Sequence, residues 1–584
     1  RVLCGFDKTR ALQPGESQTL SFEIPLESVA SYDDSGVTGH KSAWILEQGD
    51  YVFYAGADVR SASEAYSLTL PDTVVRQCKS ALGPLTAFKR MVNSNGKPEF
   101  EDVPLTGEAF PHDHAKLPAE IPQTGDRGIR LADVVNGKNT LEEFTAQLTD
   151  YDLSCIIRGE GMGSPKVTAG TAAALGGVSD TLTALGIPCA CCDDGPSGMR
   201  LDCGTKAFSL PNGTLLASTF DRPLMTELFT FMGLEMHTNQ VDCLLGPGMN
   251  IHRHPLNGRN FEYFSEDPYL TGEMASAELA GLHSTGAEGT IKHFCGNNRE
   301  TRRHFLDSVI SERALREIYL RGFEKAVKKG GAKSVMTTYG QVNGVWTAGN
   351  YGLVTGILRD DWGFDGFTMT DWWANINRRG KAPDKSDFAA MAMAQNDVYM
   401  VTADGAACND NTLDSLKSGE LTRGELQRNA MNILRFLTTT HAMKRVMGCD
   451  DETEIINRPA DAGDVDSTDI EFHDIDEDLT LDLTGITTEK GSSYAFGLNV
   501  SKPGVYKVTL TASSTLSELA QTSVSIFALG SPCGMFTFNG TSGAPVSQTK
   551  DVKFLSNFMP IRLYFGGSGL KTQSIRFELK ERWT

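Results

Sequence analysis

The sequence has no run of about eighteen uncharged apolar residues, the length that a membrane-spanning helix needs. Basic side chains are also in deficit, because 54 Lys and Arg stand against 74 Asp and Glu, a formal net charge of −20. A charge of this sign repels phosphate polymers and anionic lipid surfaces. Neither nucleic acid nor a membrane is therefore expected as a partner.

Other signals are missing as well. No internal repeat is present, and the N-terminus, "RVLCGFDKTR", has neither an initiator Met nor an apolar signal region. The twelve cysteines are scattered, and the densest group, Cys189, Cys191 and Cys192, lies in an expected buried strand whose adjacent side chains point to opposite faces. This favours packed, reduced thiols over a metal cage, and a cytoplasmic location is expected.

What is present divides the chain into several parts, since 584 residues exceed what one hydrophobic core can organise. Alternating apolar and polar residues predict a small fibronectin-like β-sandwich over 1–80, with its first strand already under way at Val2 and the chain therefore beginning inside it. Alternation returns near the C-terminus and predicts a second β-sandwich. The expected order is sandwich 1–80, connector 81–125, catalytic segment 126–448, acidic linker 449–479 and sandwich 480–584.

Two polar stretches could be taken for metal sites. His112, Asp113 and His114 lie in the connector, and spaced aspartates in the linker distantly resemble a calcium loop without its Gly and terminal Glu. Solvated loops are the better interpretation of both.

The catalytic segment alternates short apolar runs with helical patterns at intervals of roughly 30 to 45 residues. This alternation indicates a parallel sheet, and its length favours an α/β fold of the TIM-like (β/α)8 barrel type. A doubly wound open sheet is the main alternative, but no Gly-rich phosphate turn follows any strand. One helix is predicted from "SERALREIYLRGFEKAVKKG", with a buried face made by Leu315, Ile318, Tyr319, Phe323, Ala326 and Val327.

The apolar runs end in polar residues, among them Asp194, Lys292, Tyr339 and Asp371. In a barrel these strand ends converge on the face that carries active sites. A carboxylate among cationic groups has a depressed pKa and suits a nucleophile, and Trp beside polar groups suits a sugar. Glycoside cleavage needs an anion of this kind at the developing cation.

Five motifs in the catalytic segment carry a family resemblance. In order they are "CDDGPSGMR", "NGRNFEYFSEDPYLTG", "GTIKHFCGNNRE", "MTTYGQVNG" and "FDGFTMTDWW". Together they resemble the motifs of glycoside hydrolase family 3. The resemblance implies a retaining, exo-acting β-glucosidase that acts on small β-glucosides or oligosaccharides through a glycosyl-aspartate intermediate. It implies no metal and no organic cofactor.

The same resemblance assigns roles to nine residues. Asp371 is implied as the nucleophile. The implied ligands of sugar hydroxyls are Asp194, Arg200, Arg259, Lys292 and His293, and the implied pocket walls are Met336, Tyr339 and Trp372.

The general acid is the part of the pattern that is missing. A fibronectin-like segment before the barrel resembles a permuted subgroup of the family, whose α/β sandwich domain usually supplies an acidic Glu and has no counterpart in this chain. An upstream α/β sandwich domain or a second polypeptide is therefore expected to supply the acid/base. Glu160, and His304 with Asp307 in "RETRRHFLD", are the alternatives within the chain. Assembly into a homo-oligomer stays open.

Several alternatives remain at this point. A β-xylosidase or an N-acetylglucosaminidase of the same family is an alternative, although the Gly-rich motif of the N-acetylglucosaminidase subgroup is absent. A metal-dependent barrel hydrolase could be built from His252, His254, His293 and Asp371. Without an acid, the chain could also be a non-catalytic sugar-binding protein.

The C-terminal sandwich shows no stripe of exposed aromatic residues. Phe527, Phe536, Phe538 and Phe554 have the spacing of core positions on strands. A role in packing or assembly is therefore predicted for this part, in preference to polysaccharide binding.

Overall fold

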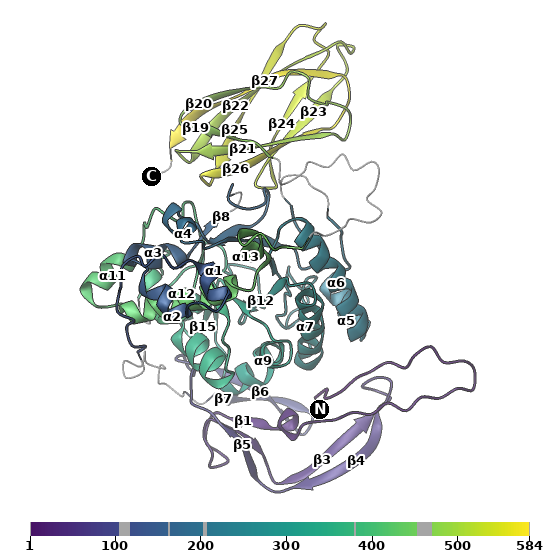
Figure 1. Ribbon diagram of the computed structural model, residues 1–584. Helices are drawn as coiled ribbons and strands as arrows, with labels where there is room; N and C mark the ends of the chain where they lie inside the picture. The colour runs from purple at the N-terminus through teal and green to yellow at the C-terminus, as the bar shows by residue number, and fades with distance from the viewer. Residues whose placement is uncertain are drawn as a thin grey trace.

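The structure is a computed structural model that describes residues 2–103, 105, 117–161, 164–201, 207–378, 381–451 and 470–582. Its three parts follow one another in space as in the sequence (Figure 1). The N-terminal strands lie at one end, a body of helices and strands lies in the middle, and the C-terminal sheets lie at the opposite end. Within the described ranges no helix is long and apolar enough to cross a bilayer.

The N-terminal part consists of small sheets around a compact apolar cluster. The sheet β1-β2-β5 and the hairpin β3-β4 comprise Ser31–Asp33, Ala43–Leu46, Thr73–Gln77, Gly49–Ala55 and Ser63–Leu70. The predicted strand at Val2 is not found, because residues 2–30 contain only the short helix η1 (Leu26–Val29). Tyr32 fixes the sheet to the central body, since its N–H donates to Glu317 at 2.7 Å.

The predicted connector contains regular structure that the sequence analysis missed. β6 (Lys89–Ser94) and β7 (Lys97–Asp102) pair as an antiparallel hairpin. The turn is Asn95–Gly96, with φ of 52° and 83°, as a two-residue type I′ turn requires. The His112–His114 cluster lies outside the described residues.

The central part is built on an eight-stranded sheet that is nearly closed into a barrel. Its order is β17-β14-β12-β11-β10-β9-β8-β18. A parallel bridge between Met369, at the end of β17, and Val398, just before β18, brings the two edge strands together. The strands are β8 (Arg158–Gly161), β9 (Ala173–Gly176), β10 (Cys189–Asp194), β11 (Cys243–Leu245), β12 (Glu288–Phe294), β14 (Ser334–Thr337), β17 (Phe367–Met369) and β18 (Tyr399–Thr402).

The expectation of a wholly parallel sheet is wrong at one strand. β9 runs antiparallel to both β8 and β10. Parallel neighbours need a long crossover, usually a helix, whereas β8 and β9 are joined by residues 162–172, whose described part contains no helix. The short connection therefore returns the chain in the opposite direction.

Helices surround this sheet. Two of the longest, α6 (Arg222–Thr238) and α7 (Pro268–His283), begin in the same way, because Asp221 and Asp267 cap them and Pro occupies their first turn. The others are α1 (Leu131–Val135), α2 (Leu141–Ala146), α3 (Asp150–Ile156), α4 (Asp180–Ala184), α5 (Gly213–Ser218), α8 (Glu312–Ala314), α9 (Arg321–Lys328), α10 (Phe388–Met393), α11 (Thr412–Ser418), α12 (Arg423–Leu437) and α13 (His441–Val446). Short elements between them are β13 (Asp307–Ser308), β15 (Gln341–Val342), β16 (Val345–Trp346), η4 (Thr347–Gly349) and the π-helix η5 (Gly352–Asp361).

The helix predicted from residue 311 onward is interrupted. A π-helical turn, η3 (Leu315–Tyr319), separates α8 from α9. Leu315, Phe323 and Ala326 are buried as predicted, but Ile318 is 42% exposed. A π turn inserts one extra residue, so that Ile318 within it leaves the regular three-or-four spacing of the buried face.

The C-terminal part consists of two sheets that share one hydrophobic core. The five-stranded sheet contains β19 (Phe472–Ile475), β21 (Ser493–Val500), β26 (Phe558–Phe565), β23 (Thr522–Ala528) and β24 (Ser531–Phe538). The four-stranded sheet contains β20 (Asp478–Asp482), β27 (Leu570–Arg582), β22 (Gly504–Ser514) and β25 (Val546–Phe554).

Two details of this part differ from the prediction. Its strands begin at Phe472, within the predicted linker, of which residues 452–469 lie outside the described ranges. Phe536, Phe538 and Phe554 are core residues, but Phe527 is only half-buried and lies 4.0 Å beneath the guanidinium of Arg562.

Candidate active site

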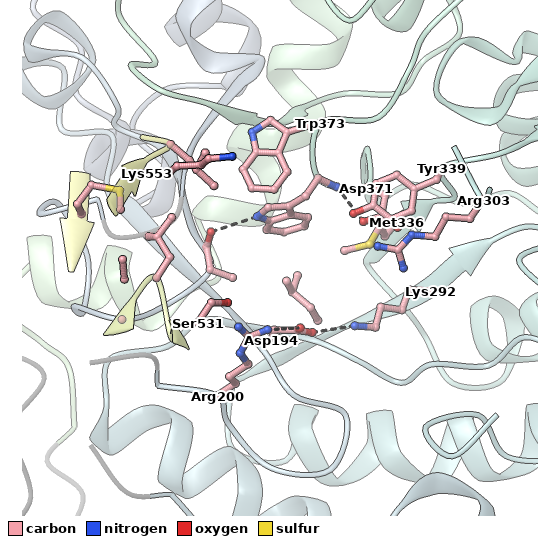
Figure 2. A pocket seen from close by; sticks show the side chains of 18 of the residues that line it. Asp194, Arg200, Lys292, Arg303, Met336, Tyr339, Asp371, Trp373, Ser531 and Lys553 are labelled. Carbon is pink, nitrogen blue, oxygen red and sulfur yellow. Dashed lines mark hydrogen bonds and ion pairs between the residues drawn. The ribbon is translucent and has the colours of Figure 1, made fainter. Parts of the chain in front are cut away.

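The carboxyl ends of the central strands surround one pocket of about 740 Å³. Asp194 is the last residue of β10, Lys292 and His293 lie in β12, and Asp371 follows β17 (Figure 2). All nine residues named from the sequence line this pocket: Asp194, Arg200, Arg259, Lys292, His293, Met336, Tyr339, Asp371 and Trp372. Strand ends that are far apart in the sequence meet here because parallel strands direct them to the same face of the sheet.

Asp371 has one carboxylate oxygen held and the other left available. Oδ1 accepts the backbone N–H of Trp372 at 2.8 Å. Oδ2 is buried and has no hydrogen-bond partner among the described residues, while Nε2 of His293 lies 3.7 Å from it. A buried oxygen with free lone pairs that lines a pocket is the arrangement that a nucleophilic carboxylate requires.

The predicted direction of the Asp371 pKa shift is wrong. Burial raises the pKa of this carboxyl to about 6, and the cations and hydrogen-bond donors around it offset that effect only in part. Those opposing groups are Arg259, the Trp372 N–H, the Tyr339 hydroxyl and Lys292. Asp371 is nevertheless mostly ionised at neutral pH, so the expectation of an anion at pH 7 holds.

The raised pKa predicts an acid limb in the pH profile. Protonated Asp371 cannot attack, so kcat/KM for an activated aryl glucoside should fall as the pH drops through about 6. Because the Tyr339 hydroxyl lowers the Asp371 pKa, Tyr339→Phe should move this limb to higher pH. Tyr494→Phe, a half-buried position in the C-terminal sheets, is the matched control and should leave the limb in place. A limb that does not move in Tyr339→Phe contradicts the assignment.

Asp194 and Lys292 form an ion pair on the pocket wall. Lys292 Nζ donates to Asp194 Oδ1 at 2.9 Å, and Arg200 lies 3.9 Å from the other oxygen. Burial alone would raise the pKa of Asp194, but Lys292, Arg259 and Arg200 outweigh it and hold that pKa below its ordinary value. The result is an ionised acceptor beside cationic donors, a combination that can bind neighbouring hydroxyl groups of a sugar.

His293 and Arg259 are held in position by buried partners. His293 Nδ1 lies 3.1 Å from the Tyr263 hydroxyl, and the backbone N–H of His293 donates to Oδ1 of Asn250. Burial, followed by the nearby cations, lowers the pKa of His293 well below its usual value, so the ring is neutral. Arg259 is bound by the carboxylate of Glu262.

Tyr339 lies between aromatic and cationic neighbours. The guanidinium of Arg303 lies over its ring at 4.3 Å, and the ring of His304 is 4.1 Å away. Burial and the Asp371 charge raise the Tyr339 pKa, so the hydroxyl stays protonated as a donor. Trp372 Nε1 donates to the Ala172 carbonyl at 3.3 Å, which fixes the indole against the pocket wall.

Neither internal candidate for the general acid lines the pocket. Glu160 is buried and accepts from Lys166 at 2.6 Å and from Ser164 at 2.7 Å. His304 packs behind Tyr339, outside the set of lining residues. Besides Asp371 and Asp194, the described residues contribute one further carboxylate to the lining, Asp551, which is paired with Lys580 at 2.6 Å.

The alternative metal site is not assembled in the described part of the chain. His252 and His254 do not gather with His293 and Asp371 into a ligand group. The one group of three that the described ranges contain is His237, His441 and Asp450, in which the two imidazole rings stack at 3.9 Å.

Sequence reasoning missed a second set of lining residues. Trp373 is the last residue of the motif "FDGFTMTDWW" and was noted beside Asp371, but no role was assigned to it. Arg303 lies shortly after the motif "GTIKHFCGNNRE", and this position was the available signal for it. Gly170, Ala172 and Leu245 are further lining residues from the central part. The others come from the C-terminal sheets: Ala528, Leu529, Ser531, Cys533, Asp551, Lys553, Leu555 and Met559. Nothing local in the sequence connects that part to the barrel strands.

A pocket with a buried carboxylate and paired polar side chains, at the carboxyl ends of a barrel-like sheet, defines the class of barrel glycoside hydrolases. The family model described as "Glycosyl hydrolase family 3 N terminal domain" matches residues 126–436, more than half of the chain. The chain therefore belongs to glycosyl hydrolase family 3, as the sequence motifs predicted. A fibronectin type III-like domain model matches residues 1–59.

Individual relatives agree with this family. A β-glucosidase of Ruminococcus albus is 59% identical over the whole chain, which covers 63% of that protein. β-Glucosidase A of Butyrivibrio fibrisolvens is 34% identical, over 76% of this chain and 54% of its own length. The crystal structure of a β-glucosidase from Paenibacillus barengoltzii superposes with a TM-score of 0.73 and 42% identity, over 97% of this chain and 63% of that one. The chain thus spans less than two thirds of the length of these relatives.

Proposed function

We propose that this pocket belongs to a retaining, exo-acting β-glucosidase that releases terminal β-D-glucosyl residues. The single observation that carries the proposal is the buried, unbonded Oδ2 of Asp371 in a pocket whose polar wall is the Asp194–Lys292 pair. The three relatives reported above are named as β-glucosidases, which supports glucose as the sugar.

In this mechanism Asp371 Oδ2 attacks the anomeric carbon of a bound glucoside. The bond to the leaving-group oxygen breaks, and a covalent glycosyl-aspartate forms through a transition state with cationic character. Asp194, Lys292 and Arg259 hold the sugar hydroxyls during this step. Water then attacks the same carbon, releases Asp371 as a carboxylate and yields glucose of the original anomeric configuration.

Leaving-group protonation requires a further group. The lining carboxylates of the described residues other than Asp371 are tied to cations, Asp194 to Lys292 and Asp551 to Lys580. The proposal therefore assigns the acid/base to a polypeptide segment outside this chain, an α/β sandwich domain or a second subunit.

The finer architecture is part of the same proposal. Residues 126–448 are taken as a (β/α)8-type barrel with one reversed strand, flanked by a fibronectin-like sandwich and a C-terminal sandwich. The support is the near closure of the eight-stranded sheet and the shared core of the two C-terminal sheets.

The test is the stereochemistry of the first product. Proton NMR of the hydrolysis of 2,4-dinitrophenyl β-D-glucoside should show β-glucose before mutarotation, because two inversions at one carbon retain its configuration. The corresponding xyloside and N-acetylglucosaminide should react more slowly, and the α-glucoside should not react. Initial release of α-glucose rules out the covalent route, and a faster xyloside or N-acetylglucosaminide reassigns the sugar.

A further inference from the structure

The outer part of the pocket is built by the C-terminal sheets. Leu529 and Ser531 lie at the turn between β23 and β24, and Lys553 and Leu555 lie at the end of β25 (Figure 2). Val552 and Phe554 point into the C-terminal core, so the alternation of a strand turns Asp551, Lys553 and Leu555 to the opposite face, toward the pocket.

The pocket has a buried polar end and an open end. Lys292, His293 and Asp371 are each at most 5% exposed, whereas Trp373 is 41% and Leu555 is 58% exposed. An exo-acting enzyme holds the terminal sugar against its nucleophile, so the rest of the bound substrate must extend toward the open end of the pocket. The groups that meet the leaving group are therefore those of the C-terminal sheets together with Trp373.

We propose that the C-terminal sheets form the leaving-group subsite of this enzyme, and that the subsite takes aromatic aglycones that carry an acidic substituent. The proposal rests on the proposed function and extends it from the sugar to the aglycone. It also replaces the packing or assembly role that the sequence predicted for these sheets.

The composition of the open end favours an aromatic ring over a second sugar. A sugar needs several convergent hydrogen-bonding groups, as Asp194, Lys292 and Arg259 provide at the buried end. The open end instead offers the Trp373 indole and the exposed side chain of Leu555, with the buried Leu529 and Met559 behind them and Ser531 as a small polar group. Such a surface gains most from a flat apolar group.

The charge at the open end selects for an anion. Asp551 is neutralised by Lys580 at 2.6 Å, whereas Lys553 makes no ion pair with any residue that the structure describes. Figure 2 shows the Lys553 side chain on the same side of the pocket as Trp373. An aromatic ring next to Trp373 would bring a carboxylate substituent toward this uncompensated ammonium group.

The experiment measures binding in the Asp371→Ala variant, which cannot turn the ligands over. Isothermal calorimetry compares 3-carboxyphenyl β-D-glucoside with its 3-carbamoylphenyl analogue, two ligands of the same shape that differ in charge. The carboxyl ligand should bind more tightly. Adding Lys553→Glu should reduce the ratio of the two affinities by about tenfold or more, because it replaces attraction by repulsion.

The matched control is Lys571→Glu in the same background. Lys571 is an exposed lysine of β27 in the same four-stranded sheet and does not line the pocket. Lys571→Glu changes the net charge by the same amount as Lys553→Glu, but away from the ligand. It should leave the affinity ratio unchanged. If the two substitutions have equal effects, or if Lys553→Glu has none, the subsite does not select for an acidic substituent and this part of the proposal is wrong. If aryl glucosides bind no more tightly than methyl β-glucoside, the proposal of an aromatic leaving-group subsite is wrong.

Failure of this proposal is distinguishable from failure of the proposed function. Turnover of 2,4-dinitrophenyl β-glucoside by the unsubstituted chain tests the nucleophile and the sugar. The affinity ratio tests the open end without any chemical step.

Discussion

Replacing Asp371 by alanine should lower kcat for 2,4-dinitrophenyl β-glucoside by on the order of 10⁴-fold or more, because the covalent route is lost. The matched control is Asp365→Ala, an exposed aspartate just before β17 that is paired with Lys333. It should leave kcat within a few-fold of the parent chain. Both variants should be measured by release of the phenol.

Three further readouts separate this effect from misfolding. Burial raises the pKa of Asp371, so the ionised side chain opposes folding above its unfolded-state pKa, and its removal should leave the melting temperature equal or higher at neutral pH. Azide should restore turnover of Asp371→Ala and give the α-glucosyl azide, since a small anion fits the space of the lost carboxylate. A 2-fluoroglucoside should label a peptide that contains Asp371, and a label on any other peptide contradicts the mechanism.

The second large effect concerns the leaving group. General acid assistance contributes typically about 10²–10⁴-fold, and the lining residues that the structure describes supply no uncommitted acid. The chain by itself should therefore be slow on alkyl glucosides and cellobiose but much less impaired on 2,4-dinitrophenyl glucoside. A plot of log kcat/KM against the pKa of the leaving phenol should have a steep negative slope.

Supplying an α/β sandwich domain of the family in trans should flatten that slope. The gain should be largest for the alkyl glucosides, whose leaving group depends most on protonation. The control is the chain alone, with its mass verified and no companion polypeptide present. If its plot of log kcat/KM against leaving-group pKa is flat and it hydrolyses cellobiose efficiently, the general acid lies within the chain. Glu160 and His304 would then be the first residues to replace.

The sequence predicted the buried end of the pocket and missed the open end, for a physical reason. Asp194, Lys292 and Asp371 lie at or near the carboxyl ends of β10, β12 and β17, three strands of one sheet, and parallel strands bring such ends to the same face whatever the loops do. Lys553 and Leu555 meet the same pocket only through the docking of separately folded sheets. No periodicity or spacing encodes that contact.

Other misses have equally specific causes. The direction of the Asp371 pKa shift depends on how completely the carboxyl is buried, which neighbouring charges in the sequence do not reveal. The Asn95–Gly96 turn carried a clear hairpin signal, but the polar flanks of β6 and β7 hid the strands. The reversal of β9 follows from the short connection between β8 and β9, which the general alternation of apolar runs and helical patterns does not reveal.

The pairing of β8 with β18 sets the time at which the central part can be completed during synthesis. Arg158 in β8 is in register with Tyr399 in β18, about 240 residues later in the chain. At roughly 5–20 residues per second, a ribosome needs on the order of 12–48 s to make that interval. Until then the free edge of β8 is exposed to other nascent chains, so this edge is where a chaperone should bind the growing polypeptide.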